Sequence, residues 1–399
     1  MNKIAVRLPI LALAAALALA PLSATWPAFA EWDGEVVPVD PPVGAMVAGS
    51  YIVSLDEGTD AADLADDAGV SPRFVYSTAL DGFAARLTPA QLSDLQRTPG
   101  VVGIEHDQVY RTESQAQATQ AVAAVGGLYG LDRIDQRNLP LSGTYTTAAP
   151  AGSVYAYVID ELIDTSHPDF GGRARNVFSV VGTASSPLAT CADHGTHVAG
   201  TIGGTIHGVA KNVQLRGVRV LDCAGAGRVS GIIEAVDWIR GNAERPAVAN
   251  LSAGGDHSPA LNAAVTSLVQ SGVSVAVAAG NEKADACATS PASAAGVMTV
   301  AASTRADSAA SSFSNWGRCV DIYAPGVGIT STAPGGGTAS MSGTSMASPH
   351  VAGAMALQKA SGDRRSSQVN RWLIRHATVR VVTANPLGTP NRLLHVEGQ

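Results

Sequence analysis

The sequence predicts an α/β protein in two parts, a small α+β domain followed by a larger domain with a mainly parallel sheet and helices on both faces. Three observations carry this prediction. Short apolar runs alternate with helical patterns from about residue 128 to the C-terminus. A strand, helix, strand, strand, helix, strand order fills residues 49–111. The composition, with 46% hydrophobic residues, 15% charged residues and 42 glycines, is typical of a folded, loop-rich chain.

The first domain, residues 48–114, has a recognisable helix start. Thr88 is followed by Gln91 three residues later, the spacing of a capping box. The other expected helix covers Asp60–Ala68, and the expected strands are Tyr51–Leu55, Phe74–Ser77, Gly82–Leu87 and Val101–Glu105. This order indicates a ferredoxin-like α+β domain. Residues 31–47, with three prolines, are expected to be a linker.

The second domain, residues 118–399, repeats strand and helix without an internal sequence repeat. Strands are expected at 153–159, 213–221, 273–278 and 297–302, and helices at 194–206, 231–241 and 260–271. Such alternation is typical of parallel strands joined by helices that cover both faces of the sheet.

The N-terminus, residues 1–30, has the three regions of a secretory signal peptide. Lys3 and Arg7 precede the apolar run Leu8–Ala20, and Ala28-Phe29-Ala30 gives a small-x-small cleavage site before Glu31. The run is too short to span a bilayer as a helix. We therefore expect a secreted protein, extracellular or periplasmic, with no membrane attachment after the signal is removed.

The charge balance bears on partners. A net charge of −7 and the lack of a polybasic block argue against nucleic acid and against anionic membranes as partners. An exported chain with four cysteines, Cys191, Cys223, Cys287 and Cys319, suggests two disulfides, and the spacing leaves all three pairings open. No pair has the C-x-x-C spacing of a zinc site.

Four polar residues stand where a serine hydrolase would need them. Asp160 ends an apolar strand, and His194 lies where a loop enters a helix. His197, one turn further on, is a second candidate base, but the metal motif H-E-x-x-H is absent. Ser345 lies among small residues before a helical pattern, and Asn281 follows a buried run as a candidate oxyanion donor. Taken alone, Asp160, Ser345 and Asn281 are each at least as well explained as turn or cap residues.

Their surroundings resemble the subtilisin-like serine proteases. The segments Val-Ile-Asp160, His194-Gly-Thr-His-Val-Ala-Gly-Thr, Ala-Ala-Gly-Asn281 and Gly-Thr-Ser345-Met-Ala-Ser-Pro-His carry the resemblance. The order Asp, His, Ser is that of subtilisin. Leu131-Asp-Arg-Ile-Asp-Gln136 and Val220-Leu-Asp-Cys223 are similar to the proteinase K branch, especially the aqualysin-type enzymes. The resemblance covers roughly residues 130–396.

The resemblance implies a serine endopeptidase that acts through an acyl-enzyme. Ser345 would be the nucleophile, His194 the general base and acid, and Asp160 its support. Asn281 and the Ser345 N–H would form the oxyanion hole. Two segments, Ser252-Ala253-Gly254 and Gly225-Ala226-Gly227, would clamp an extended peptide as a strand. The small apolar wall Ala278-Ala279-Gly280 leads us to expect apolar or aromatic residues before the cut bond in otherwise broad substrates.

The resemblance further implies the pairing Cys191–Cys223 and Cys287–Cys319. It also implies a structural Ca²⁺ site formed by Asp321 with the carbonyls of Ala295 and Val297. No cofactor is expected for catalysis. The partners implied are protein or peptide substrates, and a monomer is expected.

The first domain resembles the inhibitory propeptide of these enzymes, which makes the chain a zymogen. Such propeptides leave their C-terminal tail in the substrate cleft. Processing is expected within residues 114–118, since Ala118-Thr-Gln120 resembles aqualysin-type mature starts.

One departure from the family pattern opens an alternative. The family usually has Ser or Thr and then Gly after the triad aspartate, whereas this chain has Glu161 and Leu162. A backbone with positive φ would be costly at Leu162, and an inward-facing Glu161 should raise the imidazole pKa. The alternative is an inactive pseudo-protease that binds peptides or partners. An ester-cleaving hydrolase is a third hypothesis, disfavoured by the peptide-clamping segments. Asp164 could replace Asp160 as the carboxylate that supports the histidine. Its spacing matches a variable position of the family, however, so Asp160 remains the prediction.

Overall fold

The computed structural model describes residues 36–41, 44–112, 115–116, 128–146, 151–182, 191–362 and 364–396. The expected signal segment, residues 1–30, lies outside the described residues. No helix within these ranges is both long enough and apolar enough to cross a membrane.

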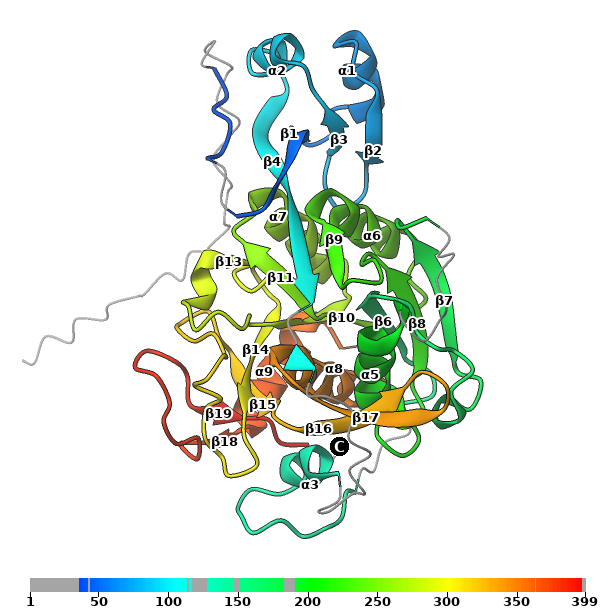
Figure 1. Ribbon diagram of the computed structural model, residues 1–399, viewed down its shortest axis with the longest axis vertical. Coiled ribbons are helices and arrows are strands. Elements are labelled where there is room, and N and C mark those ends of the chain that lie inside the picture. Colours follow the sequence, from blue (N-terminus) through cyan, green and yellow to red (C-terminus); the bar gives the residue numbers. More distant parts are fainter. Residues whose placement is uncertain are drawn as a thin grey trace, which may run out of the picture. The chain divides into compact units, whose positions relative to one another are not determined.

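A nine-stranded sheet forms the centre of the larger domain (Figure 1). Its order is β18-β19-β15-β14-β12-β10-β6-β8-β7, and every neighbouring pair is parallel except β18 with β19. The strands are β6 (Tyr155–Asp160), β7 (Ala174–Ser179), β8 (Gln214–Arg219), β10 (Ala247–Leu251), β12 (Ser274–Ala278), β14 (Met298–Ser303), β15 (Ile322–Pro325), β18 (Thr378–Val379) and β19 (Arg392–Leu393). The predicted parallel sheet is confirmed.

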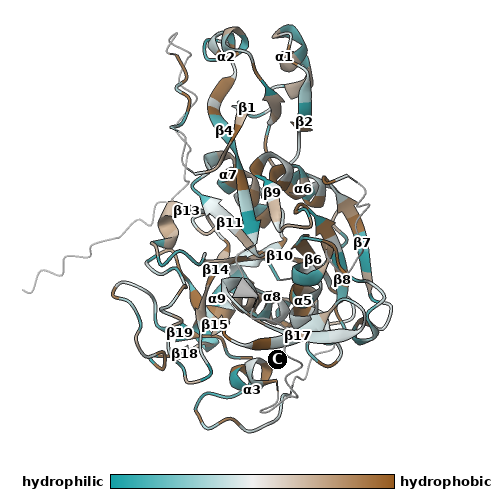
Figure 2. Cartoon of the chain, in the orientation of Figure 1, coloured by the Kyte–Doolittle hydropathy of each residue, from teal (hydrophilic) through white to brown (hydrophobic). Residues whose placement is uncertain are grey.

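Helices cover both faces of this sheet because its central strands are apolar on both sides. Alternate residues of β6 show this, since Val158 belongs to one core and Ile159 to the other. Helices α5 (Asp193–Gly203), α8 (Thr344–Ala360) and α9 (Ser366–His376) pack into the first core. Helices α6 (Val229–Asn242) and α7 (Pro259–Gln270) pack into the second. Figure 2 shows the hydropathy of these elements along the chain.

The N-terminal domain has the predicted ferredoxin-like order. Its strands are β1 (Met46–Leu55), β2 (Pro72–Tyr76), β3 (Gly82–Arg86) and β4 (Val101–Thr112), and its helices are α1 (Ala61–Asp67) and α2 (Pro89–Leu95). The strand order is β4-β1-β3-β2, all antiparallel. The capping box of Thr88 and Gln91 is present at the start of α2.

The expected linker is shorter than the prolines suggested. β1 begins at Met46, inside the predicted range of 31–47. Val37 donates to Gln96 O and Asp40 donates to Ile104 O, so this segment lies along the N-terminal domain. Prolines at 38 and 41 are compatible with an extended edge segment, because such a segment does not need every N–H.

Short elements complete the fold. β9 (Ala226–Arg228), β11 (Ala253–Asp256) and β13 (Thr289–Ser290) join the sheet of the N-terminal domain, and β16 (Ile329–Ala333), β17 (Gly337–Ser342) and β5 (Gln115–Ala116) form a third sheet. The remaining helices in the described part of the chain are α3 (Tyr129–Ile134), η1 (Pro168–Phe170) and η2 (Ala286–Ala288). β4 is thus shared, with its last residues bonded to strands of the larger domain.

Candidate active site

Asp160 and His194 form a buried pair at the carboxyl end of β6. Asp160 is fully buried, and both of its carboxylate oxygens lie 2.9 Å from His194 Nδ1. Asp160 Oδ1 also accepts the Glu161 N–H at 2.7 Å. This geometry holds Nδ1 as the protonated nitrogen, which leaves Nε2 as the basic one.

His194 is the second residue of α5, and its charge is set by two opposing effects. Burial disfavours the imidazolium, but Asp160 and Glu161 outweigh it and raise the pKa of His194. His194 Nε2 is buried and makes no hydrogen bond with any residue that the structure describes. The base of the proposed triad is therefore oriented at Nδ1 and unengaged at Nε2.

Ser345 is held near the N-terminus of α8, as the second residue of that helix. Its Oγ donates to Ser252 O at 3.0 Å rather than to His194, and Ser252 Oγ donates to Ser345 O at 3.1 Å. Pro349 explains the second bond, because a proline four residues on has no N–H for the Ser345 carbonyl. Ser252 satisfies the carbonyl that Pro349 leaves without a helical partner.

A buried polar chain supports these two serines, and sequence reasoning missed it. Ser348 Oγ donates to Asn250 Oδ1 at 2.7 Å, and Asn250 Nδ2 donates to Ser252 Oγ at 2.8 Å. Asn250 lies within the otherwise apolar strand β10. A polar residue inside a buried strand was the available signal, because burial requires a hydrogen-bonding partner.

Asn281 lies beside the start of α8. Its Oδ1 accepts hydrogen bonds from both Thr344 N and Thr344 Oγ1, each at 3.0 Å. Because the oxygen end of the amide is held, Nδ2 is its donor end. Thr344, which sequence reasoning also missed, fixes the orientation that an oxyanion donor requires.

A second asparagine fixes the loop that carries Asn281. Asn315 Nδ2 donates to Ala279 O and to Glu282 Oε2, and its Oδ1 accepts from the N–H groups of Glu282 and Ala284. Gly280 has φ +103° and approaches Asn315 so closely that a Cβ would lie 2.2 Å from Nδ2. The predicted wall, Ala278-Ala279-Gly280, ends β12 and is buried.

The two predicted clamping segments hold a strand of the chain itself. In β4, Thr112 pairs with Ala253 and Arg111 pairs with Gly254 of β11. On the other side, Arg111, Tyr110 and Val109 pair with Ala226, Gly227 and Arg228 of β9. Thr112 N also donates to Gly225 O at 2.9 Å. Beyond the gap at 113–114, β5 pairs with Met341 and Ser342, three residues before Ser345.

The departure after Asp160 does not disturb the pair. Leu162 is not among the residues with positive φ, so the backbone cost that a positive φ would bring at Leu162 does not arise. The backbone after Asp160 instead packs closely against α5, where a Cβ on Gly195 would lie 2.6 Å from Leu162 O. Glu161 does face inward, and its Oε2 accepts the His194 N–H at 3.2 Å. Asp164 binds Ser166 and Gly335 N instead of the histidine.

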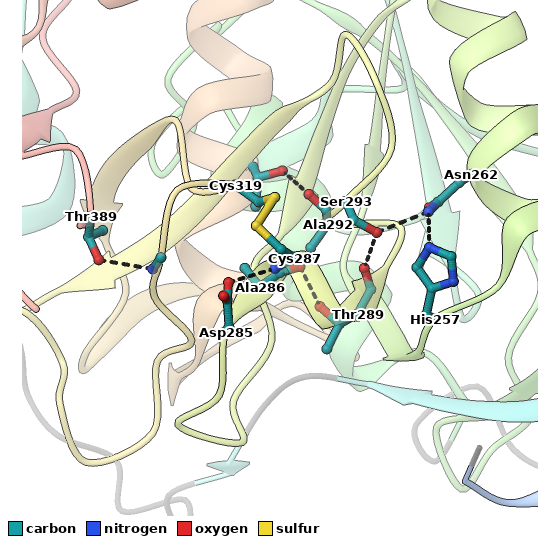
Figure 3. Close-up of a disulfide and its surroundings, with 12 residues drawn as sticks. His257, Asn262, Asp285, Ala286, Cys287, Thr289, Ala292, Ser293, Cys319 and Thr389 are labelled. Carbon is teal, nitrogen blue, oxygen red and sulfur yellow. Dashed lines mark hydrogen bonds between the residues drawn. A yellow bond between two sulfur atoms is a disulfide. The ribbon is translucent and has the colours of Figure 1, made fainter. Parts of the chain in front are cut away.

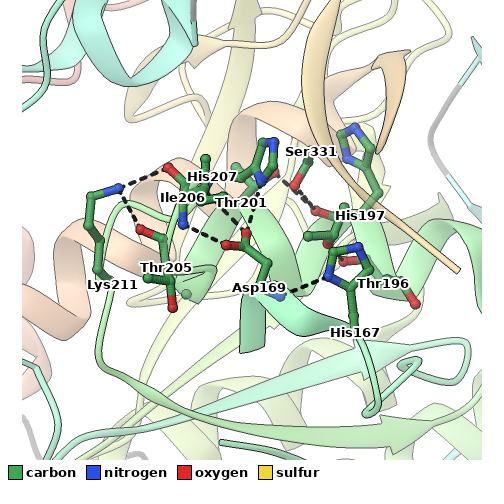
Figure 4. A network of polar contacts seen from close by, with 12 residues as sticks. His167, Asp169, Thr196, His197, Thr201, Thr205, Ile206, His207, Lys211 and Ser331 are labelled. Carbon is green, nitrogen blue, oxygen red and sulfur yellow. Dashed lines mark hydrogen bonds and ion pairs between the residues drawn. The ribbon is translucent and has the colours of Figure 1, made fainter. Parts of the chain in front are cut away.

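His197 has a structural role. Its Nε2 lies 2.9 Å from Ile329 O, and burial lowers its pKa to about 3, which keeps it neutral. A network of polar contacts follows α5 (Figure 4). In it, Asp169 accepts from Ile206 N at 2.6 Å and contacts His207 Nδ1 at 2.9 Å. These contacts satisfy the chain beyond the C-terminal end of α5 and so hold the helix that carries His194.

The structure joins Cys191 to Cys223 and Cys287 to Cys319, the pairing that the resemblance implies. The first disulfide ties the start of α5 to the loop before β9. The second lies beside η2, where Asp285 accepts the Cys287 N–H at 2.9 Å (Figure 3). Both bonds brace loops next to the clamping and oxyanion segments.

Asp321, the predicted calcium ligand, is a carboxylate that already accepts one backbone hydrogen bond. It is partly buried, burial raises its pKa to about 6, and its Oδ2 accepts the Thr299 N–H at 2.9 Å. Within the described ranges, no cluster of three or more His, Cys, Asp or Glu side chains could hold a metal. Only a site built mainly from backbone carbonyls, as for Ca²⁺, fits this donor set.

Two family models match this chain. Residues 153–398 match the subtilase family, and residues 50–113 match the peptidase inhibitor I9 family. The I9 match ends at residue 113, directly after the last residues of β4, which lie between the clamping segments.

Several curated proteins are similar to this chain. Alkaline serine exoprotease A of Vibrio alginolyticus is 48% identical over 324 residues, covering 80% of this chain and 59% of its own length. Extracellular serine proteinase of Thermus sp. is 47% identical over 324 residues, covering 80% and 77%. Proteinase R of Parengyodontium album is 38% identical over 392 residues, covering 95% and 97%.

A solved structure agrees with these relatives. The crystal structure of a cold adapted subtilisin-like serine proteinase matches with a TM-score of 0.65 and 48% identity, covering 68% of this chain and 99% of that one. These matches agree with the buried Asp160–His194 pair, with Ser345 at a helix start and with β4 between the clamping segments. The chain belongs to the subtilase family of serine proteases and carries its own I9 inhibitor domain as an N-terminal propeptide.

Proposed function

We propose that this subtilase hydrolyses peptide bonds through Asp160, His194 and Ser345. The observation that carries the proposal is the extended strand β4, which pairs with β11 on one side and with β9 on the other. The Asp160–His194 pair lies at the carboxyl end of β6 in the same domain as β9 and β11. A strand bound in this way is oriented as a substrate backbone would be.

The chemistry follows from the hydrogen bonds around Ser345. The Ser345 hydroxyl leaves Ser252 O, gives its proton to His194 Nε2, and its oxygen attacks the substrate carbonyl carbon. The charge that develops on the carbonyl oxygen is met by Asn281 Nδ2 and the Ser345 N–H at the start of α8. His194 then protonates the leaving amine, which gives an acyl-enzyme, and a water molecule activated by His194 releases the acid.

The clamps support broad specificity, because they bind backbone rather than side chains. The pairing of β4 with Ala253 and Gly254 requires only N–H and C=O groups of the bound strand. The small apolar wall Ala278-Ala279-Gly280 favours an apolar or aromatic residue before the cut bond. A series of peptides that differ only at this residue tests the preference, and a uniform rate across the series contradicts it.

Self-processing belongs to the same proposal. The pairings of Thr112 with Ala253 and of Gln115 with Ser342 bracket a bond between Thr112 and Gln115. This interval overlaps the early part of the expected window, 114–118, and favours its N-terminal end. None of Thr112, Glu113 and Ser114 is apolar, so self-cleavage here depends on the register of the tethered strand rather than on side-chain preference. Mass spectrometry of the mature N-terminus tests this, and a start after Gln115 contradicts it.

A structural Ca²⁺ ion at Asp321, with the carbonyls of Ala295 and Val297, is proposed on the chemistry of the donor set. A partly buried carboxylate with a pKa raised to about 6 gains from a nearby cation. Bound ion would stabilise the folded protein without taking part in catalysis. Melting the mature protein with and without a chelator tests the site, with Asp321→Asn as the matched variant. A Tm that chelation leaves unchanged contradicts it.

Export and a monomeric state complete the proposal. Residues 1–30 have the pattern of a signal peptide, and one relative is named an extracellular serine proteinase. N-terminal sequencing of exported protein and sedimentation of the mature enzyme test the two statements.

The central experiment compares the full precursor with its Ser345→Ala variant. The parent is expected to shed its propeptide and digest casein, whereas the variant stays full length and inactive. If both proteins stay full length and neither cuts, the binding-only alternative replaces the proposal. If the variant cuts as fast as the parent, Ser345 is not the nucleophile.

A further inference from the structure

Glu161 is a second carboxylate in contact with the catalytic histidine. It is buried, with 6% of its surface exposed, and follows Asp160 directly at the end of β6. Its N–H donates to Asp160 Oδ1 at 2.7 Å, and its Oε2 accepts the His194 N–H at 3.2 Å. The same strand end therefore contacts one histidine twice, at the imidazole through Asp160 and at the backbone through Glu161.

We propose that Glu161 is a positioning residue for His194, which anchors the first turn of α5 and, when ionised, stabilises the imidazolium beside Asp160. The proposal rests on the triad proposed above. It assigns a role to the position where the subtilisin-like pattern has Ser or Thr, which are uncharged.

The first half of the proposal follows from helix geometry. The N–H groups in the first turn of a helix have no partner within the helix, and a carboxylate there satisfies one of them. The N-cap residue of α5, Ala192, makes no side-chain hydrogen bond to the helix. Glu161 supplies from β6 the cap that Ala192 lacks, and so ties the histidine to the strand that carries its aspartate.

The second half follows from charge. Burial, and then the charge of Asp160, raise the pKa of Glu161 to about 7, while His194 acts in the opposite direction. The same interaction, seen from the histidine, raises the pKa of His194. Each group therefore holds its charge more readily when the other is charged, and the two titrate as a coupled pair.

Other ionisable groups near the pair do not duplicate this role. Asp193 precedes His194 in α5 but is exposed, so water screens it. His197 of α5 and His350 of α8 are kept neutral, because burial lowers their pKa values to about 3 and about 4. Arg219 of β8, opposite Asp160 in the sheet, donates to Leu221 O and Gly182 O.

The ionisable residues of the loop that follows Glu161 also have partners other than His194. Asp164 binds Ser166 and Gly335, His167 contacts Gly337 O, and Asp169 contacts His207. The segment 183–190, which lies outside the described residues, contains no ionisable side chain in its sequence. Among the described residues, Asp160 and Glu161 are thus the carboxylates that raise the pKa of His194.

The test is the pH dependence of kcat/KM for the mature enzyme and two variants. Glu161→Gln keeps an acceptor for the His194 N–H and removes the charge, whereas Glu161→Ala removes both. Since catalysis needs neutral His194, the acid limb of the profile follows its pKa. Both variants are expected to move this limb to lower pH by at least about half a unit, as for loss of a charge at close range. Only Glu161→Ala is expected to lower the plateau kcat as well, by several-fold.

Controls separate this result from other causes. Asp193→Asn removes an exposed carboxylate next to His194 and is expected to leave the limb in place. An active, Ser345-dependent Glu161→Gln enzyme with an unshifted limb overturns the inference, while activity that survives Ser345→Ala overturns the triad itself. If the Glu161 variants do not mature, the imidazole of His194 is titrated by NMR in full-length Ser345→Ala precursors with and without Glu161→Gln. There a lower pKa in the Gln variant supports the inference, and an equal pKa overturns it.

Discussion

At the residue scale, Thr344 holds the oxygen end of the Asn281 amide and so sets the direction of its donor end. Thr344 donates twice to Asn281 Oδ1, so the amide cannot turn over without losing both bonds. We expect Asn281→Ala to lower kcat by about 10²–10³, the cost known from subtilisin for losing one such donor, with little change in KM. The donor acts on charge that develops only in the transition state, so substrate binding is spared. Steady-state kinetics on a short peptide and the first-order rate of self-processing both measure it.

Thr344→Val provides the matched control for this prediction. It removes the hydroxyl bond to Asn281 and keeps the backbone bond, so a loss of only several-fold is expected. A rise in KM at constant kcat in Asn281→Ala would instead assign Asn281 to substrate binding.

At the element scale, α5 is held against the end of β6 without room for a side chain. A Cβ on Gly195 would lie 2.6 Å from Leu162 O, a backbone atom that cannot rotate away. We expect Gly195→Ala to displace α5 from the strand end that carries Asp160, at a cost of about 1–3 kcal/mol of stability. Activity should fall at least about tenfold, because catalysis is sensitive to displacements of about 1 Å. Thermal melting and kcat/KM measure the two effects.

The control at this scale is a glycine with open space around it. Gly337, at the start of β17, has nothing within 4 Å of its ideal Cβ position and no positive φ. Gly337→Ala should leave both the Tm and the activity unchanged. Wild-type activity in Gly195→Ala would show that α5 tolerates the shift.

At the scale of the whole molecule, the propeptide docks through carboxylates at helix starts. Glu105 contacts Ser258 Oγ and the Ala260 N–H of α7, while Asp107 accepts from Ser230 N and Ser230 Oγ of α6. Burial raises the pKa of Glu105 to about 7, above its value of 4.5 in an exposed chain. Docking of the propeptide is therefore favoured when Glu105 is protonated. This stabilisation of the docked state is lost as the pH rises from the exposed pKa of 4.5 through about 7.

The measurable consequence is the affinity of the free propeptide for mature enzyme. Its Kd is expected to increase by about tenfold or more between pH 5 and pH 8, on the basis of the shift at Glu105. Glu105→Gln should flatten this dependence, since the amide has no proton to lose. Inhibition constants measured across this range, with activity itself corrected for pH, test it. A Kd that falls with rising pH contradicts it.

The sequence predicted the elements that local patterns control. The alternation of apolar strands and helices, the capping box at Thr88 and the strand-end position of Asp160 all depend on residues close together in the chain. The supports of the site depend on residues far apart. Ser348 binds Asn250 across 98 positions, and Asn315 binds the Asn281 loop across more than 30. No local pattern encodes such pairs, because each polar group is chosen to satisfy a partner that only the fold brings near.

The start of α8 shows a second kind of miss. The helical pattern was expected after Ser345, yet the helix begins at Thr344 and contains Pro349. A proline so far inside a helix normally argues against it, because it removes one hydrogen bond. Here the freed carbonyl is that of Ser345, and Ser252 supplies the missing donor. A tertiary contact thus overrides a local rule at the nucleophile.

The seating of β4 between β9 and β11 has a consequence for when the enzyme is switched on. While the chain is intact, strand and cleft are parts of one molecule, and their encounter does not depend on how much protein is present. After one bond is cut, the same strand becomes a separate ligand that competes by mass action. Dilution then favours its release, and each released propeptide is a potential substrate for enzyme that is already free. If the proposed self-processing holds, activation is expected to be autocatalytic and to depend on protein concentration.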